Sequence, residues 1–231
     1  MVSAASSLTQ VMTELAAKFS ADHPGVTIRN NFGASGTLEQ QIRRGAVVHL
    51  FVSAAARQMD ALERDGLIDP ASRRVLAGNE LVLVAPPGGG ESLKDFAGLA
   101  SERVARVAMG TPASVPAGEY AQAALESMGL WEAVRRKVVF TTNVRQALTY
   151  AERGEVDAAL VYRSDAREGG MVRVVAVAPP GSHPPIVYPA ALLADVAGKE
   201  AAGAYLDFLS GPDGAAAFLR HGFTAAPHPE R

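Results

Sequence analysis

Short runs of small and hydroxyl-bearing residues precede four predicted helices of the sequence. They read AASS before Leu8, GASGT before Leu38, SVPAG before Glu119 and TTN before Val144. The first amides of a helix have no partner within the helix, and small residues let a ligand approach them closely. Helix starts of this kind bind anions through their N–H groups. The four turns are therefore candidates for an anion-binding site.

A single turn of this kind is typical of any helix start, since Ser, Asn and Gly are common N-cap residues. Four such turns favour a ligand more strongly. Each helix N-terminus acts as roughly half a positive elementary charge, so four supply on the order of +2. That charge suits a dianion without Lys or Arg in contact. Hydroxyl and amide donors without acceptor carboxylates favour a fully deprotonated tetrahedral oxyanion over hydrogen phosphate, which keeps a proton.

Three charged side chains near these turns have interpretations other than the binding of an oxyanion. Asp165 follows Tyr162 by three positions and is interpreted as a cap of that turn. Arg145 and Arg163 could clamp an organic carboxylate. Arg145 directly follows Val144, however, so its side chain is expected to point away from the amides and into solvent.

Strands and helices alternate along the chain in two blocks, which is typical of an α/β fold with parallel sheets and crossover helices. A first strand ending at Val2 would be short, and no signal peptide precedes it. The strand at 186–194 is expected to return to the first lobe, and PPGGG at 86–90 is either a hinge or a surface loop. Further strands are predicted at 26–32, 47–54, 80–86, 103–110, 137–142, 158–162 and 172–179.

The composition excludes several classes of protein. Of 231 residues, 48% are hydrophobic and 20% charged, and the net charge of −2 gives no basic face for nucleic acid. The absence of cysteine excludes disulfides, thiolate metal sites and a Cys nucleophile. No apolar run is long enough to span a membrane. His49 is interpreted as structural rather than as a metal ligand, since no second ligand has a suitable spacing.

Several segments together resemble the periplasmic molybdate-binding proteins of molybdate ABC transporters, over essentially the whole chain. They are AASSL, FGASGTLEQQI, VPAGEYAQAAL, NVRQAL and ALVYRSDA in that order, then YPAALL and AYLDFLSGPDGAAAFLRHGF. The resemblance implies a type II periplasmic-binding-protein fold in which two lobes close on the anion in a cleft. Each lobe would be a mostly parallel sheet flanked by helices. We expect lobe I at 1–82 and 187–231, and lobe II at 83–186.

The resemblance also implies a set of ligand-binding groups, a non-catalytic role and a partner. The protein would capture molybdate, and tungstate of the same charge and shape, and deliver it to a membrane permease. It would act as a monomer without cofactor, in the periplasm or anchored outside a single-membrane bacterium. The anion would accept hydrogen bonds from hydroxyl and amide groups of Ser7 and Ser35, the N–H groups of Ala117 and Val144, and the Tyr162 hydroxyl.

Departures from the family and rival functions remain open at this point. The family often has an acidic residue in place of His49 and another near Ala55, which bears on lobe–lobe or transporter contacts. A receptor for another oxyanion, such as sulfate, is the main alternative. A serine hydrolase is a weaker one, because the turn around Ser35 reads GASGT rather than G-x-S-x-G. PPGGGESLK at 86–94 lacks the spacing of a nucleotide-binding P-loop.

Overall fold

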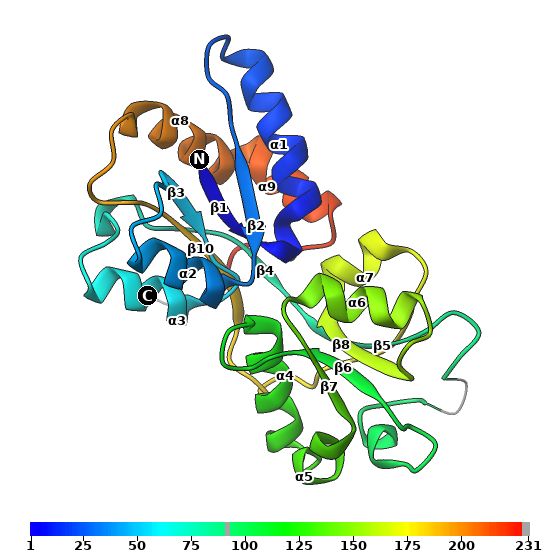
Figure 1. The fold of residues 1–231 in the computed structure, drawn as a ribbon. Coiled ribbons are helices and arrows are strands. Elements are labelled where there is room, and N and C mark those ends of the chain that lie inside the picture. Colours follow the sequence, from blue (N-terminus) through cyan, green and yellow to red (C-terminus); the bar gives the residue numbers. More distant parts are fainter. Residues whose placement is uncertain (91–92, 228–231) are drawn as a thin grey trace. The chain divides into compact units, whose positions relative to one another are not determined.

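The computed structural model describes residues 1–90 and 93–227, which form two compact units. Unit 1 comprises Met1–Gly78 and Val187–Arg231, and unit 2 comprises Asn79–Ile186. Each unit contains a five-stranded sheet flanked by helices (Figure 1). No helix within the described ranges is both long and apolar enough to cross a membrane.

Unit 1 has a mixed sheet with the strand order β2-β1-β3-β10-β4. Strand β1 is parallel to β2 and β3, whereas β10 is antiparallel to β3. The predicted return of the chain through β10 is confirmed. The elements are β1 (Val2–Ala5), η1 (Ser6–Leu8), α1 (Thr9–Asp22), β2 (Asn30–Gly33), α2 (Ser35–Arg43), β3 (Leu50–Val52), α3 (Ala56–Arg64), η2 (Pro70–Ser72), β4 (Arg74–Asn79), β10 (Ile186–Leu192), α8 (Lys199–Ser210) and α9 (Pro212–Arg220).

Unit 2 repeats this plan with the strand order β7-β6-β8-β5-β9. Strand β6 is parallel to β7 and β8, and β5 is antiparallel to β8 and β9. The sheets are therefore mixed rather than mostly parallel. The elements are β5 (Leu81–Ala85), η3 (Ala97–Ala100), β6 (Val107–Gly110), α4 (Pro116–Ser127), α5 (Trp131–Val134), η4 (Arg135–Lys137), β7 (Val138–Thr141), α6 (Val144–Glu152), β8 (Ala158–Tyr162), α7 (Arg163–Gly169) and β9 (Arg173–Val177).

Several observed elements differ in their bounds from the sequence-based expectation, and three differences concern the course of the chain. The first strand runs from Val2 to Ala5 instead of ending at Val2. Strand β4 was not predicted, and unit 1 ends at Gly78 rather than at residue 82. The reason is that β5 pairs with two strands of unit 2. The stretch 86–90 lies within unit 2 and is not one of the two crossings between units; Glu91 and Ser92, which continue it, lie outside the described residues.

Apolar residues on one face of each helix pack against fully buried strands. Every residue of β1, β5 and β8 is buried, and each of these strands lies between two others in its sheet. In unit 1, α2 and α3 contribute residues at helical spacing to one cluster. Its members include Leu38, Ile42, Val48, Phe51, Met59, Leu62 and Ile68.

Helix α4 begins in unusually close contact with the end of β6. A Cβ atom at Gly118 would overlap the carbonyl group of Gly110, and one at Gly110 would overlap the side chain of Val115. Pro116 occupies the first turn, where its missing N–H costs nothing. Glycine is therefore required at both positions for the helix start to lie directly on the strand end.

We expect Gly118→Ala to lower the free energy of unfolding by about 1–3 kcal/mol, because an added methyl group forces a backbone shift. Gly203→Ala in α8 is the matched control, since its Cβ would meet only Leu192 Cδ1 at 4.0 Å. That variant should be neutral or more stable by up to about 1 kcal/mol. Urea denaturation followed by circular dichroism measures both. Equal stability of the two variants would contradict the close approach.

Candidate functional site

Ser7 and Ser35 lie at the carboxyl ends of two neighbouring parallel strands of unit 1. Ala5, the last residue of β1, is the register partner of Gly33 at the end of β2. Ser7 follows in η1, and Ser35 is the first residue of α2. Both serines are buried, with 1% and 0% of their surface exposed. The structure thus brings these two predicted residues to one edge of one sheet.

The Ser35 hydroxyl does not cap its own helix. The N-cap residue of α2 is Ala34, and no side chain caps this helix start. Instead, the Ala54 N–H donates to Ser35 Oγ over 3.0 Å, and this hydrogen bond is buried. Because a backbone N–H can only donate, the hydroxyl hydrogen of Ser35 remains available for an acceptor. The ordinary explanation of a serine at a helix start, capping, therefore does not account for Ser35.

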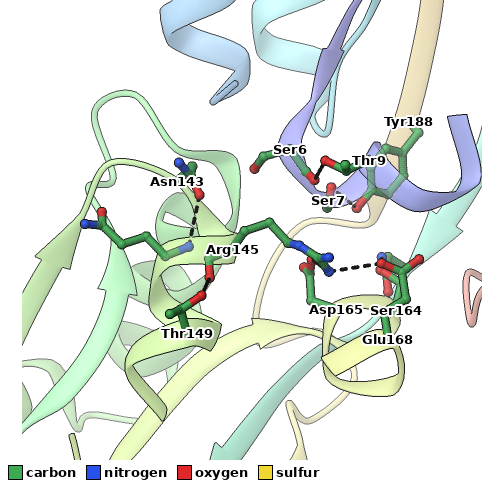
Figure 2. A network of polar contacts seen from close by, with 12 residues as sticks. Ser6, Ser7, Thr9, Asn143, Arg145, Thr149, Ser164, Asp165, Glu168 and Tyr188 are labelled. Carbon is green, nitrogen blue, oxygen red and sulfur yellow. Dashed lines mark hydrogen bonds and ion pairs between the residues drawn. The ribbon is translucent and has the colours of Figure 1, made fainter. Parts of the chain in front are cut away.

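Ser7 has a similar buried neighbour. Its Oγ lies 3.1 Å from the hydroxyl oxygen of Tyr188 in β10, as Figure 2 shows. Neither η1 nor α1 has a side-chain cap. If the phenol donates, as the more acidic group, the Ser7 hydroxyl can donate onward. In contrast, Ser6 contributes its carbonyl oxygen to Thr9 Oγ1 at 2.7 Å, and Thr37 in α2 is exposed.

A third strand-to-helix turn of unit 1 was missed by sequence reasoning. It joins β3 to α3 and contains Ala54, the donor to Ser35. Ser53 closes it, because Ser53 Oγ donates to the Ala55 carbonyl at 2.8 Å and accepts from the Ala55 N–H at 3.2 Å. The run SAAA had the same small-residue character as the other turns and was the available signal. This turn fixes the orientation of the Ser35 hydroxyl.

In unit 2, Ala117 and Val144 lie in the first turns of α4 and α6. The two helices follow β6 and β7, which are parallel neighbours with Gly110 opposite Thr141 at their ends. The N–H groups of the first helical turn have no intrahelical acceptor. Both residues are buried, at 1% and 3% exposure. The structure thus brings these two residues to one edge of the sheet of unit 2.

Asn143 and Tyr162 lie at the same sheet edge of unit 2 as Ala117 and Val144. Asn143 Oδ1 accepts the Gln146 N–H at 3.0 Å, so this side chain is an ordinary N-cap. Tyr162 ends β8, with 1% exposure, and its ring lies edge-on to Tyr120 at 6.5 Å between centroids. Strands β6 and β8 are parallel neighbours. The Tyr162 side chain therefore belongs to the same edge as Ala117 and Val144.

Arg145 is paired with two acids rather than solvated, contrary to the expectation. Its Nη1 lies 3.0 Å from Glu168 Oε2 and 3.5 Å from Asp165 Oδ1 (Figure 2). The Asp165 side chain is fully buried and that of Glu168 is 4% exposed. Burial raises the pKa of Asp165 to about 7, Arg145 opposes this shift, and Glu168 adds to it. A backbone hydrogen bond from Tyr162 also favours the Asp165 carboxylate, which is the capping contact predicted for it.

The contacts of His49 and Ser35 do not indicate a metal centre or a nucleophile in the part of the chain that the structure describes. Across residues 1–90 and 93–227, no three His, Asp or Glu side chains gather as metal ligands would. His49 Nδ1 lies 3.1 Å from the Met1 amino group. Ser35 Oγ accepts the Ala54 N–H, whereas a serine nucleophile requires a base such as an imidazole beside it.

Comparisons with known proteins identify relatives over nearly the whole chain. The family model of bacterial extracellular solute-binding proteins matches residues 1–224. The molybdate-binding protein ModA of Escherichia coli is 39% identical over 230 residues, covering 96% of this chain and 88% of that protein. A putative ABC transporter substrate-binding lipoprotein of Bacillus subtilis, YvgL, is 38% identical over 224 residues, covering 97% and 85%.

The fold also matches a solved structure. The periplasmic molybdate-binding protein of Azotobacter vinelandii superposes with a TM-score of 0.86 at 25% identity, covering 98% of this chain and 99% of that one. The neighbours found by structure are two-lobed periplasmic binding proteins. The predicted fold class, a two-lobed α/β fold of the periplasmic-binding-protein type, is thereby confirmed, although both sheets are mixed where mostly parallel sheets were predicted.

The raised pKa of Asp165 predicts a pH dependence of stability. In the folded protein the Asp165 side chain keeps a proton that it releases near pH 4 in the unfolded chain, where the pKa of an Asp side chain has its ordinary value. The stabilising contribution is therefore complete below about pH 4 and is lost as the pH rises to about 7, where the folded group titrates. Asp165→Asn cannot titrate and should flatten the fall in unfolding free energy across this window.

Urea denaturation at pH steps between 4 and 8 measures this slope. Asp213→Asn is the control, because Asp213 is 59% exposed and pairs with Lys18 at the surface. This control should keep the parent's slope. An unchanged slope in Asp165→Asn would show that Asp165 holds no proton in the folded protein.

Proposed function

The chain belongs to the bacterial extracellular solute-binding proteins, and from this premise we propose that it is the substrate-binding protein of an ABC transporter whose ligand is molybdate. Relatives named as molybdate-binding proteins support the choice of ligand. The protein binds tungstate as well, since both are tetrahedral dianions of nearly equal size. It delivers the anion to a membrane permease, acts as a monomer without catalysis or cofactor, and works in the periplasm or at the outer cell surface.

The observation that carries this proposal is the hydrogen bond from Ala54 N–H to Ser35 Oγ. It occupies the serine as an acceptor and leaves its hydroxyl as a donor at a helix N-terminus. A helix start with an oriented hydroxyl and unpaired amides suits an oxyanion. A ligand without acceptor atoms would leave these buried donors unpaired, at a cost of about 1–3 kcal/mol each.

The proposed ligand groups are hydroxyls and amides drawn from both units. Unit 1 supplies Ser7 and Ser35, and unit 2 supplies Ala117, Val144 and Tyr162. Two helix starts in each unit contribute on the order of +1, so the two units together match a charge of −2. Arg145, the candidate clamp for an organic carboxylate, pairs with Asp165 and Glu168. Its charge is thus already compensated, which disfavours a carboxylate receptor.

A donor-rich site also discriminates by protonation state. Molybdate and sulfate are fully deprotonated near pH 7, whereas phosphate keeps a proton that needs an acceptor. Phosphate should therefore bind most weakly. Sulfate has the right charge but is smaller than molybdate, so donors spaced for molybdate would contact sulfate less closely. Selection against sulfate then depends on the spacing of the donors.

We expect Ser35→Ala and Ser7→Ala each to weaken molybdate binding by about 1.5–3 kcal/mol, the range for hydrogen bonds to a charged group. Isothermal titration calorimetry measures the affinity, and its stoichiometry reports the folded fraction. Ser210→Ala is the control, because Ser210 Oγ donates to carbonyl groups of its own helix α8, those of Leu206 at 2.6 Å and Asp207 at 3.4 Å. Parent-like affinity of both Ser7→Ala and Ser35→Ala would refute the assigned site.

A calorimetric comparison of four anions tests the ligand itself. We expect molybdate and tungstate to bind alike, sulfate more weakly and phosphate most weakly, for the reasons of charge, size and protonation given above. The purified protein is titrated with each anion at the same pH and ionic strength. Absence of heat with molybdate and tungstate would overturn the proposed function, and tighter binding of sulfate would assign the protein to sulfate.

A further inference from the structure

A buried charged cluster joins helices α6 and α7 of unit 2. It consists of Arg145 on α6 and of Asp165 and Glu168 on α7, and one guanidinium nitrogen contacts both carboxylates (Figure 2). The side chains are 27%, 0% and 4% exposed. The two helices pack together and also on β8. The cluster is thus a defined link rather than a flexible surface ion pair.

Each end of this link adjoins a proposed ligand group. Arg145 directly follows Val144, whose N–H is one proposed donor. Asp165 stands three residues after Tyr162 and accepts a backbone hydrogen bond from it. Thr149 Oγ1 donates to the Arg145 carbonyl at 2.9 Å, which ties Arg145 further into α6. A shift between α6 and α7 would therefore move Val144 relative to Tyr162.

Neither attraction of the anion nor stability explains the cluster well. Two carboxyl groups against one guanidinium give it no net positive charge, so it does not attract a dianion. Removing charges from water costs several kcal/mol per ion, and apolar side chains of similar size often stabilise as much or more. A planar guanidinium held by two carboxylates does provide a fixed geometry. The property that an apolar contact would not supply is this fixed spacing.

On the basis of the proposed function, we propose that Arg145, Asp165 and Glu168 are positioning residues that hold the Val144 amide and the Tyr162 hydroxyl at a fixed spacing and thereby select the size of the anion. They contact one another and act through the backbone beside these donors, without contact to the ligand. Loss of the link should weaken molybdate binding and should reduce the preference for molybdate over the smaller sulfate.

Glu168→Gln distinguishes a positioning role from a purely electrostatic one, because the two roles predict opposite changes in the affinity for molybdate. The change keeps the shape of the side chain and removes one negative charge. If the cluster acts only through its charge, a dianion should bind more tightly. If it positions the donors, molybdate should bind about tenfold more weakly, and the ratio of sulfate to molybdate dissociation constants should fall. Calorimetry with molybdate and with sulfate on the full chain gives both numbers.

A double-mutant cycle identifies the group through which the cluster acts. In a Tyr162→Phe background, which lacks the hydroxyl, Glu168→Gln should cost less than about threefold. In a Ser35→Ala background it should still cost about tenfold, because Ser35 belongs to unit 1. Glu132→Gln is the matched control, since Glu132 pairs with Arg135 in the same unit at an exposed position. That control should leave the dissociation constant unchanged.

Arg145→Lys provides a second variant should Glu168→Gln fold poorly. It keeps the positive charge but replaces the rigid planar guanidinium by a compact ammonium on a flexible stem, which does not hold both carboxyl groups in the same geometry. Binding should again weaken, with unchanged stoichiometry. Parent-like or tighter binding with an unchanged sulfate ratio in these variants, or full additivity with Tyr162→Phe, would overturn the positioning role. If the parent protein binds no molybdate, the proposed function fails instead, and the two failures are distinguishable.

Discussion

The structure depends on one constraint, the placement of helix starts directly after parallel strands. Adjacent parallel strands end at the same edge of a sheet, so the helices that follow them begin side by side. The pairing of Ala5 with Gly33 does this in unit 1, and that of Gly110 with Thr141 does it in unit 2. Every helix start carries amides that its own backbone cannot satisfy. An edge with two such starts is therefore rich in donors whatever ligand it binds.

The surrounding residues determine which of these donors stay available. Asn143 uses its side chain to cap α6, but α2 begins at Ala34 and Ser35 without a side-chain cap. The hydroxyl of Ser35 is instead engaged as an acceptor by Ala54, so its hydrogen points elsewhere. Charged groups nearby are paired among themselves, as Glu39 is with Arg43. The result in each unit is a neutral donor surface, which binds through dipoles and therefore by geometry.

Local patterns predicted much of the fold and of the candidate site. Helical spacing of apolar residues and the small-residue turns are local signals, and they located the starts of α2, α4 and α6. Strand pairing is not local. The first two residues of β4 are exposed and the next four are buried, so β4 lacks the alternation typical of a strand, and nothing in its sequence shows that β5 belongs to the other unit. The contacts of Ser35 with Ala54 and of Ser7 with Tyr188 span 19 and 181 residues of chain. Such partners follow only from the folded topology.

Neutral donors select a ligand by the spacing between them. The charged residues of unit 2 therefore have a role other than direct contact with the anion. An Arg at a helix start near an anion site suggests a direct contact, yet Arg145 is held by Asp165 and Glu168. A guanidinium without a carboxylate partner would attract any anion, since Coulomb attraction discriminates little by the size of the anion. A guanidinium that is paired with carboxyl groups and holds two helices together favours only an anion that fits the donors on those helices. Compensating the charge and fixing the spacing are therefore two consequences of the same contacts.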